Sequence, residues 1–385
     1  MNIQNIMPVI FARSLQTLRE FCVMPRLVNR DYSTAPAAQG ETVNWQVPTA
    51  IAAQDVVPSN VLVNASAPTP LRASVTLNRW REVPVPMTDK VLSEIGDTGR
   101  SLYIDEQIKA LANDINSFIL SRFVGLHSLV GTPGTSLFAG SDYTARTVPL
   151  RTAMRRLDDA LAPGDGRALV LHTSTYADIL GIPEFIRVNE SGREAALRSG
   201  VVGEILGFNV ARDQQVPTHA ATTLSAGAAT VNGVNAIGAT TVSIAKATNA
   251  GTLIAGDIIQ INHGGAIGIQ QYAVTANTTL IVGNTNVPIN RGLVAATAGG
   301  EAVTLVAGAA PYRVNLAFHR DALAFASRPL TAEANTDTMM QIVDPVSGVA
   351  FRMELQRQHR QTVLMFDCLY GASVLRPDLG IRFVE

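Results

Sequence analysis

The stretch SLYIDEQIKALANDINSFILSRFV, residues 101–124, decides the fold more than any other part of this chain of 385 residues. Its apolar side chains recur at three- and four-residue steps, which places them on one face of an α-helix. They are Ile104, Ile108, Leu111, Ile115, Phe118, Ile119 and Phe123. Ser101 can cap the start, and Asp105 and Glu106 suit the first turn. Burial of this face contributes on the order of 10–20 kcal/mol before the entropy cost, which is enough to anchor one domain.

The N-terminal part of the chain, residues 1–41, is predicted to form an arm with an amphipathic helix. An apolar cluster that includes Phe11 begins the arm. Further along, apolar side chains fall on one helical face until Pro25 ends the pattern. They are Leu15, Leu18, Phe21 and Cys22.

Residues 42–88 differ in character from the arm. Proline recurs through them, at Pro48, Pro58, Pro68, Pro70, Pro84 and Pro86. Short β-type runs lie between the prolines, at 42–47, 56–63 and 73–85. The segment has too few large apolar residues to form its own globule, and structureless loops of this length are uncommon in compact domains. We therefore predict an extended, hairpin-like excursion that is covered by a neighbouring copy of the chain.

Residues 149–217 alternate between helix and strand patterns, which indicates an α+β arrangement. Pro149 suits the first turn of a helix. A strand is predicted at 168–172 and a second helix at 174–180, followed by a helical fragment at 194–198. A turn and another strand follow from residue 203.

Residues 218–308 are rich in Ala, Gly, Thr, Val and Asn. Six β-type runs are separated by Gly- and Asn-containing turns, which favours a small barrel or sandwich. The runs are 228–232, 240–245, 257–262, 268–275, 279–282 and 302–306. The earlier pattern resumes at Tyr312, so this part is predicted to be inserted into a host fold. Near the C-terminus, 350–355 and 363–369 alternate like two antiparallel strands.

Composition excludes several classes of protein. The formal net charge is −1, with 47% hydrophobic and 16% charged residues, which excludes a disordered chain. No basic stripe is present, so a dedicated DNA-binding protein is not indicated. Two cysteines exclude a disulfide framework. No apolar run reaches the ~18 residues needed to span a membrane, and no signal peptide is recognised, so we expect a protein that is made and kept in a cytoplasm.

The sequence carries no motif of a catalytic, cofactor-binding or metal site. Phosphate-binding loops, dinucleotide-binding glycines, nucleophile elbows and Cys-x-x-Cys pairs are all absent. None of the six histidines lies within five residues of another, so no local metal-binding pair exists. Asp158 and Asp159 follow Arg155 and Arg156, which favours exposed ion pairs. We expect no enzyme activity and no cofactor.

Four stretches together resemble one protein family. They are Tyr103–Asn113 (YIDEQIKALAN), Gly203–Pro217 (GEILGFNVARDQQVP), Phe318–Ala326 (FHRDALAFA) and Tyr370–Pro377 (YGASVLRP). In order and spacing they are similar to the major capsid proteins of tailed bacteriophages. The likeness is greatest to the short-tailed-phage branch whose coat protein has an inserted β domain, and Gly256–Ile261 (GDIIQI) resembles a strand of that domain.

The resemblance implies an α+β, tailed-phage (Hong Kong 97-type) major capsid fold with an inserted all-β, barrel-like domain. Its expected parts follow the chain. They are an N-terminal arm (1–41), an extended loop (42–88), a peripheral domain with a spine helix (89–148), the first part of an axial domain (149–217), the inserted β domain (218–308), the second part of the axial domain (309–336), and peripheral strands with the C-terminus (337–385).

The function implied by the resemblance is self-assembly into pentamers and hexamers of an icosahedral shell around the phage genome. The expected partners are further copies of the chain, a scaffolding protein, a portal protein and an optional decoration protein. Double-stranded DNA would be enclosed without sequence-specific contact, and no membrane is involved. The expected location is the virion capsid, with the host cytoplasm during assembly.

The subunit interface is predicted from position in the pattern. The candidate residues are Trp45, Val47, Leu77, Trp80, Arg81, Phe11, Leu15 and Leu18. Large aromatic residues dominate interface energies, which favours the two tryptophans as anchors. Some relatives join their subunits through Lys–Asn isopeptide bonds, but residues 45–85 contain no lysine, so we predict no such cross-link.

Three other readings of the sequence stay open. An encapsulin-like nanocompartment shell would share the fold but should lack the inserted domain and would hold an enzyme cargo. A β-rich virion adhesin or tail component would account for residues 218–308 but not for the long helix. A hydrolase could still assemble its site from residues that are distant in the sequence.

Overall fold

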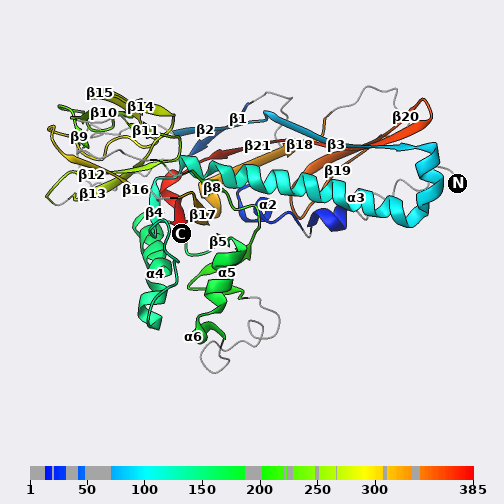
Figure 1. The fold of residues 1–385 in the computed structure, drawn as a ribbon, viewed down its shortest axis with the longest axis horizontal. Coiled ribbons are helices and arrows are strands. Elements are labelled where there is room, and N and C mark those ends of the chain that lie inside the picture. Colours follow the sequence, from blue (N-terminus) through cyan, green and yellow to red (C-terminus); the bar gives the residue numbers. More distant parts are fainter. Residues whose placement is uncertain are drawn as a thin grey trace, which may run out of the picture.

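The computed structural model describes residues 14–19, 21–31, 42–47, 71–186, 202–220, 222, 229–247, 251–265, 267–306, 310–330 and 339–385. The elements are shown in Figure 1. The helices are α2 (Met24–Leu27), α3 (Asp89–Leu120), η1 (Ser121–Gly125), α4 (Tyr143–Asp159), α5 (Thr173–Leu180), α6 (Pro183–Ile186), η2 (Arg320–Ala322) and η3 (Pro377–Leu379). The strands are β1 (Thr42–Val47), β2 (Leu71–Thr76), β3 (Arg79–Thr88), β4 (Ser128–Val130), β5 (Arg167–Leu171), β6 (Glu204–Ile205), β7 (Phe208–Arg212), β8 (Thr218–His219), β9 (Ala229–Val231), β10 (Thr241–Lys246), β11 (Gly251–Leu253), β12 (Ile258–Asn262), β13 (Ile269–Ala273), β14 (Thr278–Leu280), β15 (Gly283–Pro288), β16 (Ala302–Val306), β17 (Tyr312–His319), β18 (Leu323–Arg328), β19 (Met339–Val343), β20 (Ala350–Gln358), β21 (Gln361–Val374) and β22 (Gly380–Val384).

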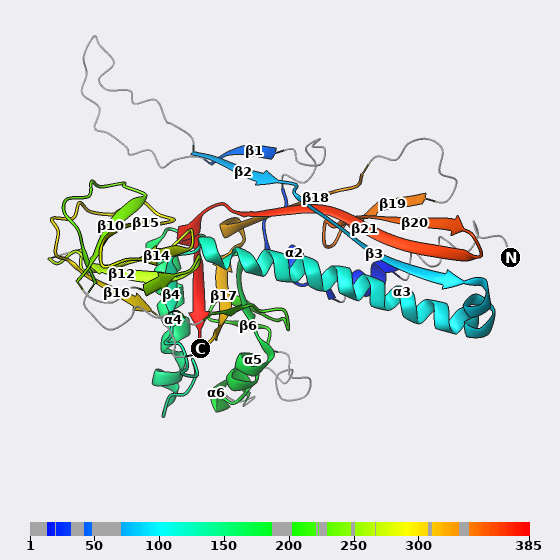
Figure 2. The same cartoon turned by 45° about the horizontal axis from the view of Figure 1, so that its top comes forward.

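The predicted long helix is α3, which runs along one side of the molecule (Figures 1 and 2). It begins twelve residues earlier than predicted, at Asp89, and Ser101 lies inside it instead of at its cap. Thr88 is the true cap, because its hydroxyl accepts the amide hydrogen of Val91 over 3.3 Å. Gly96 and Gly99 lower the helix propensity of the early turns, which hid them from the sequence pattern.

The peripheral sheet has the order β18-β21-β20-β19, and β3 pairs with β21. The two C-terminal strands β20 and β21 are antiparallel, as predicted. The run at 73–85 was predicted as one strand, but it is two, because β2 ends at Thr76 and β3 begins at Arg79. In β3, Pro84 and Pro86 carry no amide hydrogen, which is tolerated because β3 pairs with β21 alone in the described part of the chain.

Residues 71–88 of the extended segment pair through their backbone with strands of their own subunit, while most side chains of β3 stay exposed, so cover of that face by a neighbouring copy stays a prediction. Ten residue pairs join β3 to β21. The side chains of Val75 and Leu77 are completely buried. The predicted run at 56–63 lies outside the described residues.

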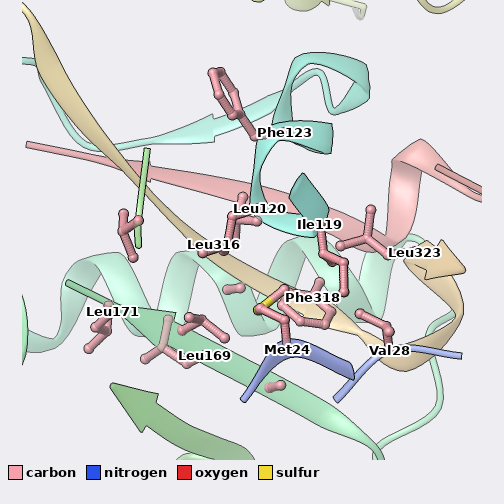
Figure 3. Packing of buried hydrophobic residues seen from close by; sticks show 14 of the residues in the cluster. Met24, Val28, Ile119, Leu120, Phe123, Leu169, Leu171, Leu316, Phe318 and Leu323 are labelled. Carbon is pink, nitrogen blue, oxygen red and sulfur yellow. The ribbon is translucent and has the colours of Figure 1, made fainter. Parts of the chain in front are cut away.

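A second sheet has the strand order β4-β22-β17-β5-β7-β6, and the helices α4 and α5 lie near it. Its strands β5 and β17 bury Leu169, Leu171, Leu316 and Phe318 against the end of α3, as Figure 3 shows. Helix α4 was predicted to begin at Pro149, but Asp142 caps it and Pro149 lies inside it. The predicted fragment at 194–198 lies outside the described residues.

Residues 229–306, which we name the β module, form a six-stranded sheet of order β13-β12-β16-β9-β10-β15 and a pair, β11 and β14. Six strands were predicted here and eight are present, because β11 and β15 contain too few large apolar residues to show a pattern. The module has its own buried core of Val, Ile, Leu, Ala and Tyr side chains. It lies at the C-terminal end of α3 (Figures 1 and 2).

No helix in the described ranges is both long and apolar enough to span a membrane.

Candidate assembly surface

Trp80 is held in a fixed position on the surface of the peripheral sheet. Half of its side chain is exposed (49%). Its indole nitrogen donates a hydrogen bond to Asp367 Oδ2 over 2.9 Å. Arg352 holds the same carboxylate with Nε at 2.9 Å and with Nη2. Because Asp367 is itself buried, the ring loses little further freedom when a partner covers it.

Arg81, the next predicted interface residue, faces the helix side of β3. Its Nε lies 3.5 Å from Asp114 Oδ2 on α3, and both side chains are largely exposed. An exposed ion pair of this kind contributes about 0–1 kcal/mol. The hydroxyl of Tyr370 also donates to Asp114, and burial together with that bond raises the pKa of Tyr370. Asp114 thus joins α3 to both β3 and β21.

The base of the extended segment is a two-stranded hairpin of β1 and β2. Val43, Val75 and Leu77 pack against Ala326 and Leu369 of the peripheral sheet. Leu77, a predicted interface residue, therefore belongs to the subunit core. Trp45 and Val47 lie in β1, and their side chains are outside what the structure describes.

The N-terminal arm crosses α3 and is fastened to it. Leu18 is completely buried in the core, and Leu15 is half-buried against it. Leu18 therefore has no surface to offer a second subunit, and Phe11 lies outside the described residues. The buried side chain of Asn116 accepts from the amide of Met24 over 3.2 Å and donates to the carbonyl of Phe21 over 2.8 Å. Figure 3 shows Met24 and Val28 of the arm beside the end of α3.

Ion pairs fasten the arm to the body at two further points. Arg19 donates to the buried carboxylate of Asp344 over 2.8 Å. Burial acts to raise the pKa of Asp344, but hydrogen bonds from Ser347 and Arg19 hold it below the ordinary value. Further along, Arg320 donates hydrogen bonds to both carboxylate oxygens of Asp31, over 2.9 and 3.0 Å. The described part of the arm is thus bound to its own subunit.

Within the described ranges, no group of three or more His, Cys, Asp or Glu side chains could hold a metal ion. A cleft of about 780 Å³ lies beside the arm, and arginines and carboxylates line it in equal number. Arg320 and Arg167, two of these arginines, already bond to Asp31 and Asp158. Two of the four arginines in the cleft are therefore already paired with carboxylates.

Sequence reasoning missed the polar residues whose hydrogen bonds organise this surface. They are Asn116, Asp114, Arg352 and Asp367. One signal was available, since Asp367 stands in the apolar run VLMFDCLY, where an unpaired carboxylate would be costly. Its partners could not be read from the sequence, because Trp80 is 287 positions away.

Comparison with known proteins gives a match in structure alone. No protein-family model matches the sequence, and no curated protein matches it. A solved structure of Mycobacterium phage Che8 is 16% identical, covers 94% of this chain and 90% of its own, and has a TM-score of 0.52. The capsid structure of the cyanophage P-SCSP1u is 13% identical, covers 94% and 87%, and also has a TM-score of 0.52. The chain therefore has a phage capsid fold, as the resemblance to major capsid proteins predicted.

Proposed function

We propose that this chain is a major capsid protein, which self-assembles into pentamers and hexamers of an icosahedral shell that encloses a phage genome. The observation that carries the proposal is the likeness to a phage capsid chain over 94% of this chain. The elongated shape supports it, since α3 and the long sheet beside it extend together away from the rest of the subunit (Figure 2).

The contacts between subunits are proposed to lie along the extended segment and the peripheral sheet. Residues 48–70, which connect β1 to β2, carry a single charge, at Asp55. The base of this segment is fixed to its own subunit, so the connection leaves from a defined point. Trp80 and Arg81 are exposed on β3, and Trp80 is fixed in orientation. Many such weak contacts in a closed lattice give high stability through multivalency.

The other predicted interface residues are assigned by their place. Trp45 and Val47 in β1, with Phe11 and Leu15 in the arm, stay proposed contact residues. Leu18 and Leu77 are buried in the subunit core and support the arm and the hairpin from within. This division predicts that substitutions of the contact residues impair assembly, whereas substitutions of the buried residues lower the stability of the subunit.

The β module is proposed to be the inserted domain of the short-tailed-phage branch. We further propose that a separate scaffolding protein directs assembly, that a portal protein occupies one vertex, and that a decoration protein can bind outside. We propose that the enclosed DNA makes no sequence-specific contact, and the formal net charge of −1 gives the chain no strong general attraction to phosphates.

Electron microscopy of the purified protein tests the function. We expect hollow particles when the chain is expressed with the scaffolding protein of its own phage, and irregular or open assemblies without it. Particles filled with an enzyme cargo would favour a nanocompartment shell. Trimers or fibres would favour an adhesin or tail component, and a stable monomer under all assembly conditions would contradict the proposal.

A further inference from the structure

A buried polar cluster joins the β module to the rest of the subunit. It draws one or two residues from each of five segments that are far apart in the sequence. Its members are Phe123 in η1, His219 in β8, Gly256 and Asp257 in the module, Tyr312 in β17 and Arg382 in β22. The side chains of Phe123, His219, Asp257, Tyr312 and Arg382 are each at most 6% exposed.

Arg382 occupies the centre of this cluster, and its side chain is completely buried. Its guanidinium donates one hydrogen bond to the carbonyl of Gly256 in the module. A second bond, of 3.0 Å, goes to the carbonyl of Val124 in η1, where the spine helix α3 ends. Burial lowers the pKa of Arg382 to about 9, so the group keeps its charge at neutral pH. The planar guanidinium of Arg382 therefore connects the backbone of the β module, at Gly256, to the backbone of η1, at Val124.

The neighbouring contacts restrict the same joint from the other side. His219 shares a hydrogen bond of 2.9 Å with Asp257, whose carboxylate also accepts from Thr222 over 2.8 Å. The rings stack edge to face, with centroids 5.6 Å apart for Phe123 and His219 and 5.4 Å apart for His219 and Tyr312. These contacts join the entry and the exit of the module to the turn at its centre.

Gly256 shows how closely the parts meet. Its φ is +100°, and a Cβ atom added there would lie 3.0 Å from His219 Cε1. Both the backbone conformation and the space therefore require glycine at this position. The turn at Gly256 and the ring of His219 are therefore in close contact.

We propose that Arg382 is a positioning residue that sets the angle between the β module and the end of the spine helix. A charge buried in this way is costly, and a hydrophobic side chain of similar volume could fill the space. What a hydrophobic residue cannot do is select one orientation by bonding to two particular carbonyl groups. In the shell, which rests on the proposed function, all copies would then present the module at one angle, and particle size would follow from it.

Contacts at the rim of the joint are less deeply buried than Arg382 and serve as a comparison. Gln271 of the module accepts from the amide of Leu129 over 2.9 Å, and Asn290 donates to the carbonyl of Gly125 over 2.8 Å. Hydrogen bonds within reach of water contribute less to orientation, because water can replace either partner. Gln271→Ala is therefore expected to leave the module in place.

Distances between two spin labels test the proposal in the full-length chain. Labels are attached at Ile237→Cys in the module and Tyr103→Cys on α3, where the side chains are 68% and 45% exposed. The native thiols Cys22 and Cys368 are buried with raised pKa values, so they do not compete for the label. Labelled chains are diluted among unlabelled ones, so that only distances within one subunit are measured.

Arg382→Met is expected to broaden the distance distribution at least twofold, whereas the parent chain gives one narrow peak. Arg167→Met is the matched control, because Arg167 is also buried but bonds only to nearby residues 158–163. It should reduce stability and leave the peak narrow. A narrow, unshifted peak in Arg382→Met would overturn the proposal.

Two further measurements cover the case in which Arg382→Met does not fold and test the effect on particles. If Arg382→Met fails to fold, Gly256→Ala is measured in its place. Its added Cβ should shift or broaden the distance peak, and an unchanged peak would count against the proposal. Electron microscopy of assembled Arg382→Met should show mixed particle diameters. If the parent chain forms no particles at all, the capsid function fails while the distance measurement still decides the role of Arg382.

Discussion

Replacement of Asn116 by alanine would weaken the attachment of the N-terminal arm to the spine helix. The side chain of Asn116 is 1% exposed and forms two hydrogen bonds with the arm, one with the amide of Met24 and one with the carbonyl of Phe21. After Asn116→Ala the amide of Met24 has no partner in the buried core, and the carbonyl of Phe21 loses its partner in a residue that is 37% exposed. The substitution therefore removes polar contacts and leaves the apolar packing of the arm almost unchanged.

The expected cost follows mainly from the buried amide. A buried donor or acceptor that loses its partner costs about 1–3 kcal/mol, so the loss at the Met24 amide should lower the free energy of unfolding by roughly that amount. Asn113→Ala is the matched control, since it is the same substitution one turn earlier on α3. The side chain of Asn113 is half-buried and has no hydrogen bond to the described part of the chain. We expect an effect within about 0.5 kcal/mol there.

Urea denaturation of both variants measures the difference, and hydrogen exchange locates it. The amide of Met24 should exchange much faster in Asn116→Ala than in Asn113→Ala, because its acceptor is gone. If the two variants unfold at the same urea concentration and protect Met24 equally, the hydrogen bonds of Asn116 do not hold the arm on α3.

Four other outcomes are expected. Trp80→Ala should reduce the yield of assembled particles on a density gradient about tenfold or more, as for an interface anchor worth ~2 kcal/mol, while Trp80→Phe gives an intermediate yield; equal yields would rule out an anchor role. Leu18→Ala should lower the free energy of unfolding by about 2–5 kcal/mol, and Leu15→Ala by clearly less, as judged by urea midpoints. Since the pKa of Asp344 is lowered in the folded chain, its stabilising effect is present above pH ~4 and lost as the pH falls further, so the stability difference between the parent and Asp344→Asn should shrink on acidification; a constant difference would contradict this. Mature particles should run on a denaturing gel as one band near 40.9 kDa, because residues 45–85 contain no lysine, and a ladder of covalent multimers would refute that prediction.

Local patterns predicted the elements whose stabilisation is local. The apolar face of α3 was visible in the sequence because seven side chains repeat at helical spacing, and β20 and β21 were visible because they alternate. The start of α3 was missed because Gly96 and Gly99 weaken its early turns. The strands β11 and β15 were missed because the small residues of the module carry little pattern.

Pairing over long distances could not be predicted. The long-range partners of residues 71–88 lie in β21 and β18, which are more than 230 positions away. Composition correctly showed that this segment is poor in apolar bulk, but it could not show which strands it would contact. Arg382 could not be identified for the same reason, because both of its acceptors are main-chain carbonyls that any sequence would supply.

The prolines of β3 have a consequence for a protein made in many copies. Pro84 and Pro86 occupy alternate positions of an edge strand, so their nitrogens point to the same side, away from β21. That rim offers two fewer donors to an incoming strand, which weakens any extension of the sheet there by backbone pairing with a second chain. Edge-to-edge pairing of newly synthesised copies along β3 is thereby disfavoured relative to association through side-chain contacts.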